Sequence, residues 1–295
     1  MKFKAQLHNN TVLYRIAQSL AKLGKTAVVQ LSQEFIKFIY LGESEASFQL
    51  FAPIYMKNIF VDYNIQSAHD NTIYMEFQVD NLIKVLKSAQ GNETIAVRLL
   101  RKQKKPYLTF KISGYSRSGR TVLIVQDIPV RVLTPVQMSH IREPVVPQAQ
   151  VNILLPPINN LRSVAERIKS VGQCITISAS NTGKIKFHVA SEIVDIEVFY
   201  RDLINPILPN TKEFESDQIY QNHLERYFSC TISTKNFVKF LYAHYIVPAS
   251  ISCVLIENHA IIFTVYVTTT AIGAHFEDQG NACGALTYYI PAFAL

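Results

Sequence analysis

The side chains that most often do chemistry in proteins are present in this chain, but their spacing matches no catalytic or metal-binding motif. The four cysteines are scattered, with no Cys-x-x-Cys pair and no histidine at ligand spacing. His69 and Asp70 form the only adjacent histidine–acid pair, and a turn between strands accounts for them better than a catalytic dyad. Glycine-rich phosphate loops and hydrolase motifs are absent. The sequence therefore predicts no enzyme, no metal site and no cofactor.

Lysine and arginine are the residues whose number and placement do indicate a function. The chain has 29 of them against 22 acidic residues, a net charge of +7. Apolar periodicity predicts four helices, over 12–25, 80–90, 160–171 and 234–245, and these hold ten bases but only two acids. The ten bases are Arg15, Lys22, Lys25, Lys84, Lys87, Arg162, Arg167, Lys169, Lys235 and Lys239. Elsewhere the charges nearly cancel, so the helices carry the basic excess.

These bases mostly lie opposite the apolar stripe of their helix. One explanation is that a solvent-facing helix surface is polar in any case and that lysine favours helices. Four basic helices with almost no acids favour instead a shared anionic partner. Because aromatic side chains are not interleaved with the bases, we expect contacts to phosphates, which depend on salt but not on nucleotide sequence.

A second basic cluster lies at an expected hairpin tip. It consists of Arg98, Arg101, Lys102, Lys104 and Lys105. A solvated turn explains this cluster better than a rim contact to nucleic acid, which is the alternative.

Proline marks the middle of the chain. Six of the 12 prolines fall between residues 129 and 157. Proline lacks a backbone donor and fixes φ, so this density predicts an extended connector over 133–150. The connector separates an expected N-terminal domain, 1–132, from a C-terminal domain, 151–295. A polar stretch over 202–224 predicts a long surface loop in the second domain.

The second half repeats the first. Asn81–Leu86 resembles Asn236–Leu241 at a shift of 155 residues, and Ile128–Pro129 resembles Ile290–Pro291 at a shift of 162. Many short apolar runs of strand period accompany two helices in each copy. The sequence therefore predicts an α+β fold of two repeated β-rich domains, each with two helices on one face of its sheet.

Membrane and secretory classes are disfavoured. The longest apolar stretch, 260–272, has 13 residues, whereas a membrane helix needs ~20. The N-terminus alternates like a strand and lacks the apolar core of a secretory signal. Together with cysteines that suit reduced, buried thiols, this predicts an intracellular protein without a membrane partner.

Together these features resemble the PCNA-like DNA sliding clamps. Within that fold, four segments resemble the Hus subunits of the nine-one-one DNA-damage checkpoint clamp, of a fungal type: Met1–Ala5, Asp127–Val132, Glu143–Pro147 and Leu286–Pro291. The resemblance covers the whole chain. It implies a non-catalytic nuclear subunit that forms a one-to-one-to-one ring with two other clamp-like subunits. A clamp-loader complex would place this ring on DNA at damage sites, as a platform for checkpoint signalling and repair enzymes.

The resemblance also implies roles for particular residues. The ten helix bases would face double-stranded DNA in the channel of the ring. Subunits would join through the edge strands 122–132 and 193–200, with interface residues Val122, Ile124, Ile128, Ile193, Ile196, Val198 and Tyr200. Partner peptides would dock under the connector, in a pocket formed by Val136, Met138, Ile141, Tyr289, Ile290 and Pro291.

Two departures from PCNA bear on the choice of family. PCNA is acidic with an acidic tail, whereas this chain has a pI of about 9.1 and ends at Leu295, just after its last expected strand. Both features argue against a replicative-type homotrimeric clamp, which stays an alternative. The second alternative is a basic nucleic-acid-processing enzyme of unknown chemistry, or a membrane-surface protein that uses the same bases.

Overall fold

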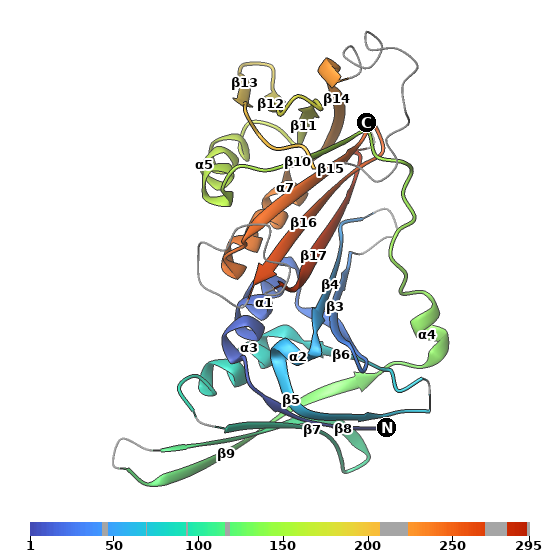
Figure 1. The fold of residues 1–295 in the computed structure, drawn as a ribbon, viewed down its shortest axis with the longest axis vertical. Coiled ribbons are helices and arrows are strands. Elements are labelled where there is room, and N and C mark those ends of the chain that lie inside the picture. The colour runs from blue at the N-terminus through green and yellow to red at the C-terminus, as the bar shows by residue number, and fades with distance from the viewer. Residues whose placement is uncertain are drawn as a thin grey trace.

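The computed structural model describes residues 1–42, 47–68, 70–92, 94–115, 119–206, 224–268 and 282–293. Strands dominate the first half of the chain, and its two longer helices follow short strands (Figure 1). The elements of this half are β1 (Lys2–Leu7), α1 (Asn10–Leu23), β2 (Thr26–Leu31), β3 (Phe35–Leu41), β4 (Gln49–Tyr55), α2 (Met56–Ile59), β5 (Phe60–Gln66), β6 (Ile73–Gln78), α3 (Val79–Ser88), β7 (Thr94–Lys102), β8 (Lys105–Tyr115) and β9 (Thr121–Val132).

The second half follows the same order of elements after a connector that contains α4 (Pro135–Ser139). Its elements are β10 (Val151–Leu154), α5 (Ile158–Ile168), β11 (Cys174–Ala179), β12 (Ile185–Ala190), β13 (Asp195–Tyr200), β14 (Phe228–Ser233), α7 (Thr234–Leu241), η1 (Tyr242–Ile246), β15 (Ser250–Ile256), β16 (Ala260–Thr268) and β17 (Ala282–Pro291). Thus α1 corresponds to α5, α3 to α7, and β9 to β17.

Two antiparallel sheets contain these strands. A sheet of 13 strands runs through both halves in the order β10-β15-β16-β17-β4-β3-β2-β6-β9-β8-β7-β1-β5, and a sheet of four strands has the order β13-β12-β11-β14. The first sheet is continuous because β17, the last strand of the second half, pairs with β4 of the first half. This β17–β4 junction therefore joins the two copies of the repeat.

Gly284 fixes the close approach of the backbones at the β17–β4 junction. It lies opposite Ile54, and its φ of +149° is in the region that favours glycine. A Cβ atom at this position would lie 2.2 Å from the carbonyl oxygen of Pro53. Any other residue at position 284 would therefore push the two strands apart.

The hydrophobic core also continues across the junction. Tyr288 of β17 is fully buried, and its hydroxyl lies 3.4 Å from the Ser19 hydroxyl of α1. Its ring packs against Phe48, before β4, and against Phe240 of α7, with centroids 5.8 and 5.5 Å away. Because these partners come from both halves, Tyr288 stabilises their arrangement as well as its own strand.

The α+β expectation is confirmed. The strands expected from period-2 runs are present, and the four helices begin within two residues of the expected limits. Three of them end within three residues of those limits, whereas α7 ends four residues early, at Leu241, and continues as η1. Most of the expected 202–224 loop lies outside the described residues. The part that is described is anchored, since the Asn205 side chain accepts the N–H of Gly183 at 2.6 Å and donates to the Asn152 carbonyl at 2.8 Å. Among the described helices, none is long and apolar enough to cross a membrane.

Candidate functional site

The basic side chains of α1 are positioned by a helix with a strongly apolar inner face. The Asn9 side chain caps its start by accepting the Val12 N–H at 3.2 Å, and the helix ends where the Gly24 N–H reaches Leu20. A Cβ at Gly24 would lie 2.5 Å from the Tyr40 ring, so a larger residue here would require Tyr40 to shift. Buried leucines and isoleucines occupy one side, which leaves Lys22 exposed on the other.

The other three helices are built in the same way. In α3, Leu82 and Leu86 are buried whereas Lys84 and Lys87 are exposed. In α7, Phe237 and Phe240 are buried, and Lys235 is exposed. The amphipathic pattern therefore orients each helix with its apolar side on the sheets and its bases toward solvent.

The four helices form one layer. α1 packs against α3 and η1, and α5 packs against α7. Figure 1 shows this layer along one side of the molecule, whereas the connector runs along the opposite side. We call the ten bases of this layer the basic helix surface. Lys25 lies just beyond α1, and Lys169 is the C-cap of α5, so these two extend the surface past the helix ends.

Seven of the ten bases are exposed and three are half-buried. The half-buried ones are Arg15, Arg162 and Lys239. The Lys239 ammonium lies 5.8 Å from the Tyr40 ring centroid and 5.9 Å from that of Phe48. These cation–π contacts hold the side chain of Lys239 against the first half of the chain. This contact could not be predicted from the sequence, because Tyr40 and Phe48 precede Lys239 by about 200 residues along the chain.

Four lysines of the basic helix surface meet at one groove. Lys22, Lys169, Lys235 and Lys239 line a groove of about 740 Å³. Thr234 also lines it, and its buried hydroxyl oxygen has no hydrogen-bond partner in the described parts of the chain. The groove thus brings bases from α1, α5 and α7 together, although they are far apart in sequence. Ammonium groups and a hydroxyl donor are the groups that contact phosphate oxygens.

Two bases of the layer, Arg162 and Lys22, act on His244 in η1. Burial is the main cause that lowers the pKa of His244 in η1, and the nearby Arg162 and Lys22 charges lower it further. His244 is consequently neutral near pH 7 and adds nothing to the basic charge. Its Nδ1 lies 3.0 Å from the Leu241 carbonyl oxygen, as expected for a packed histidine.

One acid of the layer is neutralised locally. Glu166 forms an ion pair with Lys169, whose hydrogen bond and charge lower the pKa of Glu166. Arg162 lowers it further. The pair is solvent-exposed, so its contribution to stability is small. Glu166 therefore reduces the charge of α5 without dividing the basic helix surface.

The first expected interface strand, β9, has a free edge. β9 pairs with β8 over residues 121–129 and with β6 over residues 130–132, so within the described chain its other edge has no partner over 121–129. Val122, Leu123 and Val125 are exposed there. Ile124 is partly buried against the core, and Ile128 is only 1% exposed. The assignment of the Ile128 side chain to an interface is therefore wrong, because this residue alternates into the core of the chain itself.

The second expected interface strand, β13, is the edge of the four-stranded sheet. It pairs with β12 alone among the described strands. Ile193, in the turn before it, is 93% exposed. The side chains of Ile196, Val198 and Tyr200 are half-buried against the core, so this strand offers mainly its backbone edge. β9 and β13 lie at opposite ends of the molecule (Figure 1).

The expected connector pocket is only partly assembled. Val136 is 71% exposed, and Met138 and Ile141 are half-buried. The connector is tied to the sheet by an ion pair of 2.8 Å between Glu143 and Lys37 of β3.

On the β17 side of that pocket, Tyr289 and Pro291 are half-buried. Burial and the adjacent Glu143 carboxylate raise the pKa of Tyr289, which places this ring beside the connector. The inclusion of Ile290 is wrong, because its side chain is fully buried in the core.

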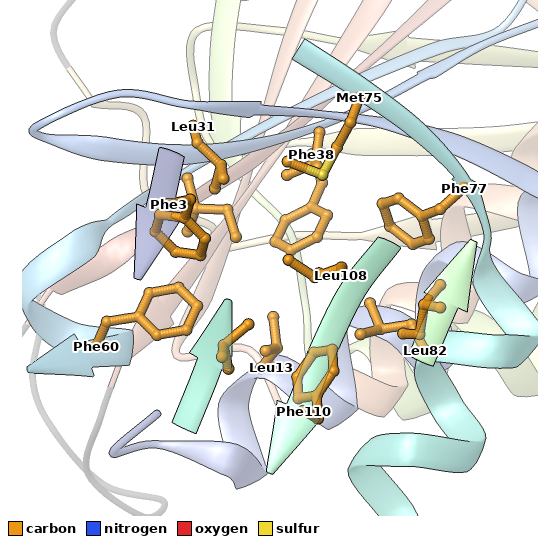
Figure 2. A pocket seen from close by; sticks show the side chains of 14 residues that line it. Phe3, Leu13, Leu31, Phe38, Phe60, Met75, Phe77, Leu82, Leu108 and Phe110 are labelled. Atoms are coloured by element: carbon orange, nitrogen blue, oxygen red, sulfur yellow. The ribbon is translucent and has the colours of Figure 1, made fainter. Parts of the chain in front are cut away.

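An enclosed cavity lies within the core of the first half (Figure 2). Its volume is about 30 Å³, and apolar side chains such as Phe38, Met75 and Phe110 line it. Without a polar group in its lining, it offers nothing for catalysis.

No cluster of three or more potential metal ligands occurs in the described parts of the chain. Cys230, Cys253 and Cys283 are buried, and burial raises the pKa of each thiol. His69 lies outside the described residues.

The fold and this geometry define the class of protein. The structure resembles that of proliferating cellular nuclear antigen from Entamoeba histolytica, with a TM-score of 0.69, 12% sequence identity and coverage of 99% of both chains. The chain has the PCNA-like sliding-clamp fold.

Sequence relationships define the family within that class. The family model described as Hus1-like protein matches residues 1–294. The checkpoint protein hus1 of Schizosaccharomyces pombe is 30% identical over 295 residues, covering 99% of each chain. The checkpoint protein HUS1 of Homo sapiens is 26% identical over 300 residues, covering 100% of each. The chain belongs to the Hus1-like family, and the resemblance to the Hus subunits is confirmed.

Proposed function

We propose that this chain is a non-catalytic subunit of a heterotrimeric ring that encircles double-stranded DNA in the nucleus. Residues 1–132 and 151–295 would be its two clamp domains, joined by the connector 133–150. A clamp loader would place the ring at damaged DNA, where it serves checkpoint signalling and repair enzymes. Relatives named as checkpoint proteins and the sliding-clamp fold support this proposal.

One observation carries the proposal: the chain already contains one copy of the joint that a ring would need. Within the chain, β17 of the second half pairs with β4 of the first. By the repeat, β9 corresponds to β17 and β13 corresponds to β4. In the described chain, β9 over residues 121–129 and β13 along its length each have an outer edge without a strand partner. Pairing β9 of one subunit with the β13-like strand of the next would repeat the internal joint and close a head-to-tail ring.

The same correspondence predicts the register between subunits. In the internal joint Tyr289 lies opposite Gln49, and Thr287 lies opposite Phe51. The equivalent residues of two copies of this chain would be Asp127 opposite Asp195, and Val125 opposite Glu197. Like charges directly opposite each other destabilise a strand pair, and a carboxylate opposite an exposed valine gains nothing. The register therefore disfavours a homotrimer and favours two different partners.

The basic helix surface supports the DNA part of the proposal. Seven of its ten bases are exposed, and four lysines meet at the groove beside α7. In a closed ring the helix layers would face the centre. Contacts of this kind are made to phosphates, so binding would be independent of sequence and would weaken as salt increases.

Partner peptides would dock on the connector side of the sheet. The residues that remain candidates are Val136, Met138, Ile141, Tyr289 and Pro291, without the buried Ile290. This side is opposite the helix layer, so a repair enzyme could bind there while DNA occupies the channel (Figure 1).

Substitution at the free edge of β9 tests the ring proposal. Val125 is 49% exposed at this edge, and Val247, after η1, is 44% exposed away from it. We expect Val125→Lys to lower ring assembly with the two partner subunits at least tenfold, because it places an uncompensated charge in the strand joint. Val247→Lys is the matched control and should assemble normally. Equal assembly of the two variants, measured by size-exclusion chromatography, would show that β9 is not the joint.

A further inference from the structure

A basic patch lies on the face of the first-half sheet that points away from the helices. Along β7 and β8 the side chains alternate: Val97 and Phe110 face the core, whereas Arg98 and Thr109 lie on the opposite face. Thr109 is only 1% exposed there, because its hydroxyl bonds to Asp127. Lys4 of β1 lies opposite Arg98, which lies opposite Thr109. These outward residues are therefore neighbours across three adjacent strands, about 5 Å apart from strand to strand.

The positive charge of this face is largely uncompensated. Five bases point outward from β1, β7 and β8 without a carboxylate partner among the described residues: Lys2, Lys4, Arg98, Lys105 and Lys111. Asp127 of the neighbouring strand β9, which lies opposite Thr109, is already engaged. It accepts a hydrogen bond from the Thr109 hydroxyl at 2.6 Å and pairs with Lys102 at 2.5 Å. Both contacts lower the pKa of Asp127 and keep it ionised.

Arg98 lies at the centre of the patch, and one of its hydrogen-bond donors has no acceptor in the described chain. It is half-buried, and its Nε is buried with no hydrogen-bond partner among the residues that the structure describes. A buried donor without an acceptor is unfavourable, and a guanidinium group suits the oxygens of a carboxylate or phosphate. An oxyanion bound at the solvent-accessible part of the Arg98 guanidinium would lie beside Lys4 and Lys111.

The size of the patch and its borders favour a short peptide over a nucleic acid. Asp127 on β9 and the exposed Asp62 on β5 border the basic strands on either side. A nucleic-acid backbone that crossed the sheet toward β5 would meet the exposed Asp62 carboxylate, whereas a short peptide fits on β1, β7 and β8 alone. Leu100, which is 37% exposed, and Tyr107 add apolar surface beside Arg98. Apolar contacts next to a compact cationic centre suit a peptide with one dense negative charge.

We propose that this outer patch binds a phosphorylated, acidic peptide segment of a partner protein, with the phosphoryl group on Arg98 and the neighbouring lysines. A phosphoryl group carries about −1.5 to −2 charges and three acceptor oxygens, which matches several unpaired bases better than a single carboxylate does. The patch is distinct from the basic helix surface, because it lies on the opposite face of the sheet. A phosphopeptide and DNA can therefore bind the chain at the same time.

Fluorescence anisotropy with three probes tests the proposal. The probes are a twelve-residue peptide of Gly, Ser and Glu with a central phosphoserine, the same peptide with serine, and a 20-base-pair duplex. The full-length chain should bind the phosphopeptide at least tenfold more tightly than the serine peptide. The variant Lys4→Glu/Lys111→Glu, in which both positions are exposed, should lose at least tenfold in phosphopeptide affinity and keep its duplex affinity. Lys25→Glu, on the basic helix surface, should do the reverse.

Arg98→Gln is a further variant that should abolish the preference for phosphoserine. Because Arg98 is half-buried, the unfolding temperature of the Arg98→Gln variant must be compared with that of the unmodified protein. If Arg98→Gln does not fold, the Lys4→Glu/Lys111→Glu variant still tests the proposal. The proposal is wrong if both peptides bind equally. It is also wrong if the Lys4→Glu/Lys111→Glu variant loses duplex affinity instead, since the patch would then be a nucleic-acid contact.

Discussion

At the scale of single residues, exposure separates the bases that can bind DNA from those that also hold the fold together. Lys84 and Lys87 are exposed on α3, whereas Lys239 lies against two aromatic rings. The sequence predicted all ten bases as equivalent, because periodicity gives the side of a helix but not the neighbour that the side chain meets. Reversing the charge of Lys239 would therefore disturb packing as well as DNA binding.

The pair Lys84 and Lys87 gives the cleaner test of the basic helix surface. We expect Lys84→Gln/Lys87→Gln to retain its unfolding temperature and to bind duplex DNA more weakly. The plot of log K against log salt has a negative slope, and each lost phosphate contact reduces the magnitude of that slope by ~0.9. The magnitude should therefore decrease by about two units in the double variant. Lys57→Gln, exposed on α2, serves as the control. An unchanged salt slope for the double variant would remove α3 from the DNA-facing surface.

The cysteines give a second prediction at this scale. Burial raises the pKa of Cys230 and of Cys283 to about 11 each, so both thiols are protonated and unreactive at pH 8. Iodoacetamide should modify the half-buried Cys174 first and the other three only after unfolding. Mass spectrometry of the digested protein would locate the label. Labelling of Cys230 as fast as that of Cys174 in native protein would contradict the burial.

The raised thiol pKa values also predict how stability depends on pH. A group whose pKa is higher in the folded state stays protonated there while the unfolded state releases its proton. This contribution to stability is present below the ordinary thiol pKa of 9.0 and is lost as pH rises through about 11. The free energy of unfolding in urea should accordingly fall between pH 9 and 11. The decrease should be smaller in Cys230→Ala, measured over the same range.

At the scale of elements, the repeat decides how the strands are used. The sequence predicted the two copies from matched segments, and it predicted β9 and the β13 region as edges through a family resemblance. The sequence did not predict that β17 pairs with β4. Pairing between strands that are far apart in the sequence depends on the tertiary fold and not on the local residue pattern. The same limit explains Ile128 and Ile290. Ile128 lies in β9, which has a free edge, and Ile290 lies in β17, which forms the junction with β4. In both strands the alternation of side chains points these residues into the core.

The β17–β4 junction makes Gly284 a sensitive position. We expect Gly284→Ala to destabilise the protein by about 1–3 kcal/mol, because alanine is strained at this φ and its Cβ would meet the Pro53 carbonyl. Gly119→Ala is the matched control, since Gly119 also has a positive φ but has nothing within 4 Å of an added Cβ. Urea unfolding of both variants measures the difference. Equal losses would mean that backbone strain alone, and not the strand junction, limits position 284.

At the scale of the whole molecule, the chain resembles an arc with two unlike ends. One end presents the edge of β9 with exposed valine and leucine side chains, and the other presents the edge of β13 (Figure 1). Unpaired edges invite association. In the proposed joint, two identical copies would place Asp127 opposite Asp195, so we expect identical subunits to fit each other poorly.

The solution mass of the chain, alone and after co-expression with two other clamp-like checkpoint subunits, tests this account most directly. We expect the isolated chain to form no stable trimer, and a one-to-one-to-one complex to appear in native mass spectrometry only when both partners are present. A stable homotrimer of this chain would contradict the proposed heterotrimeric ring. So would a monomer that ignores both partners.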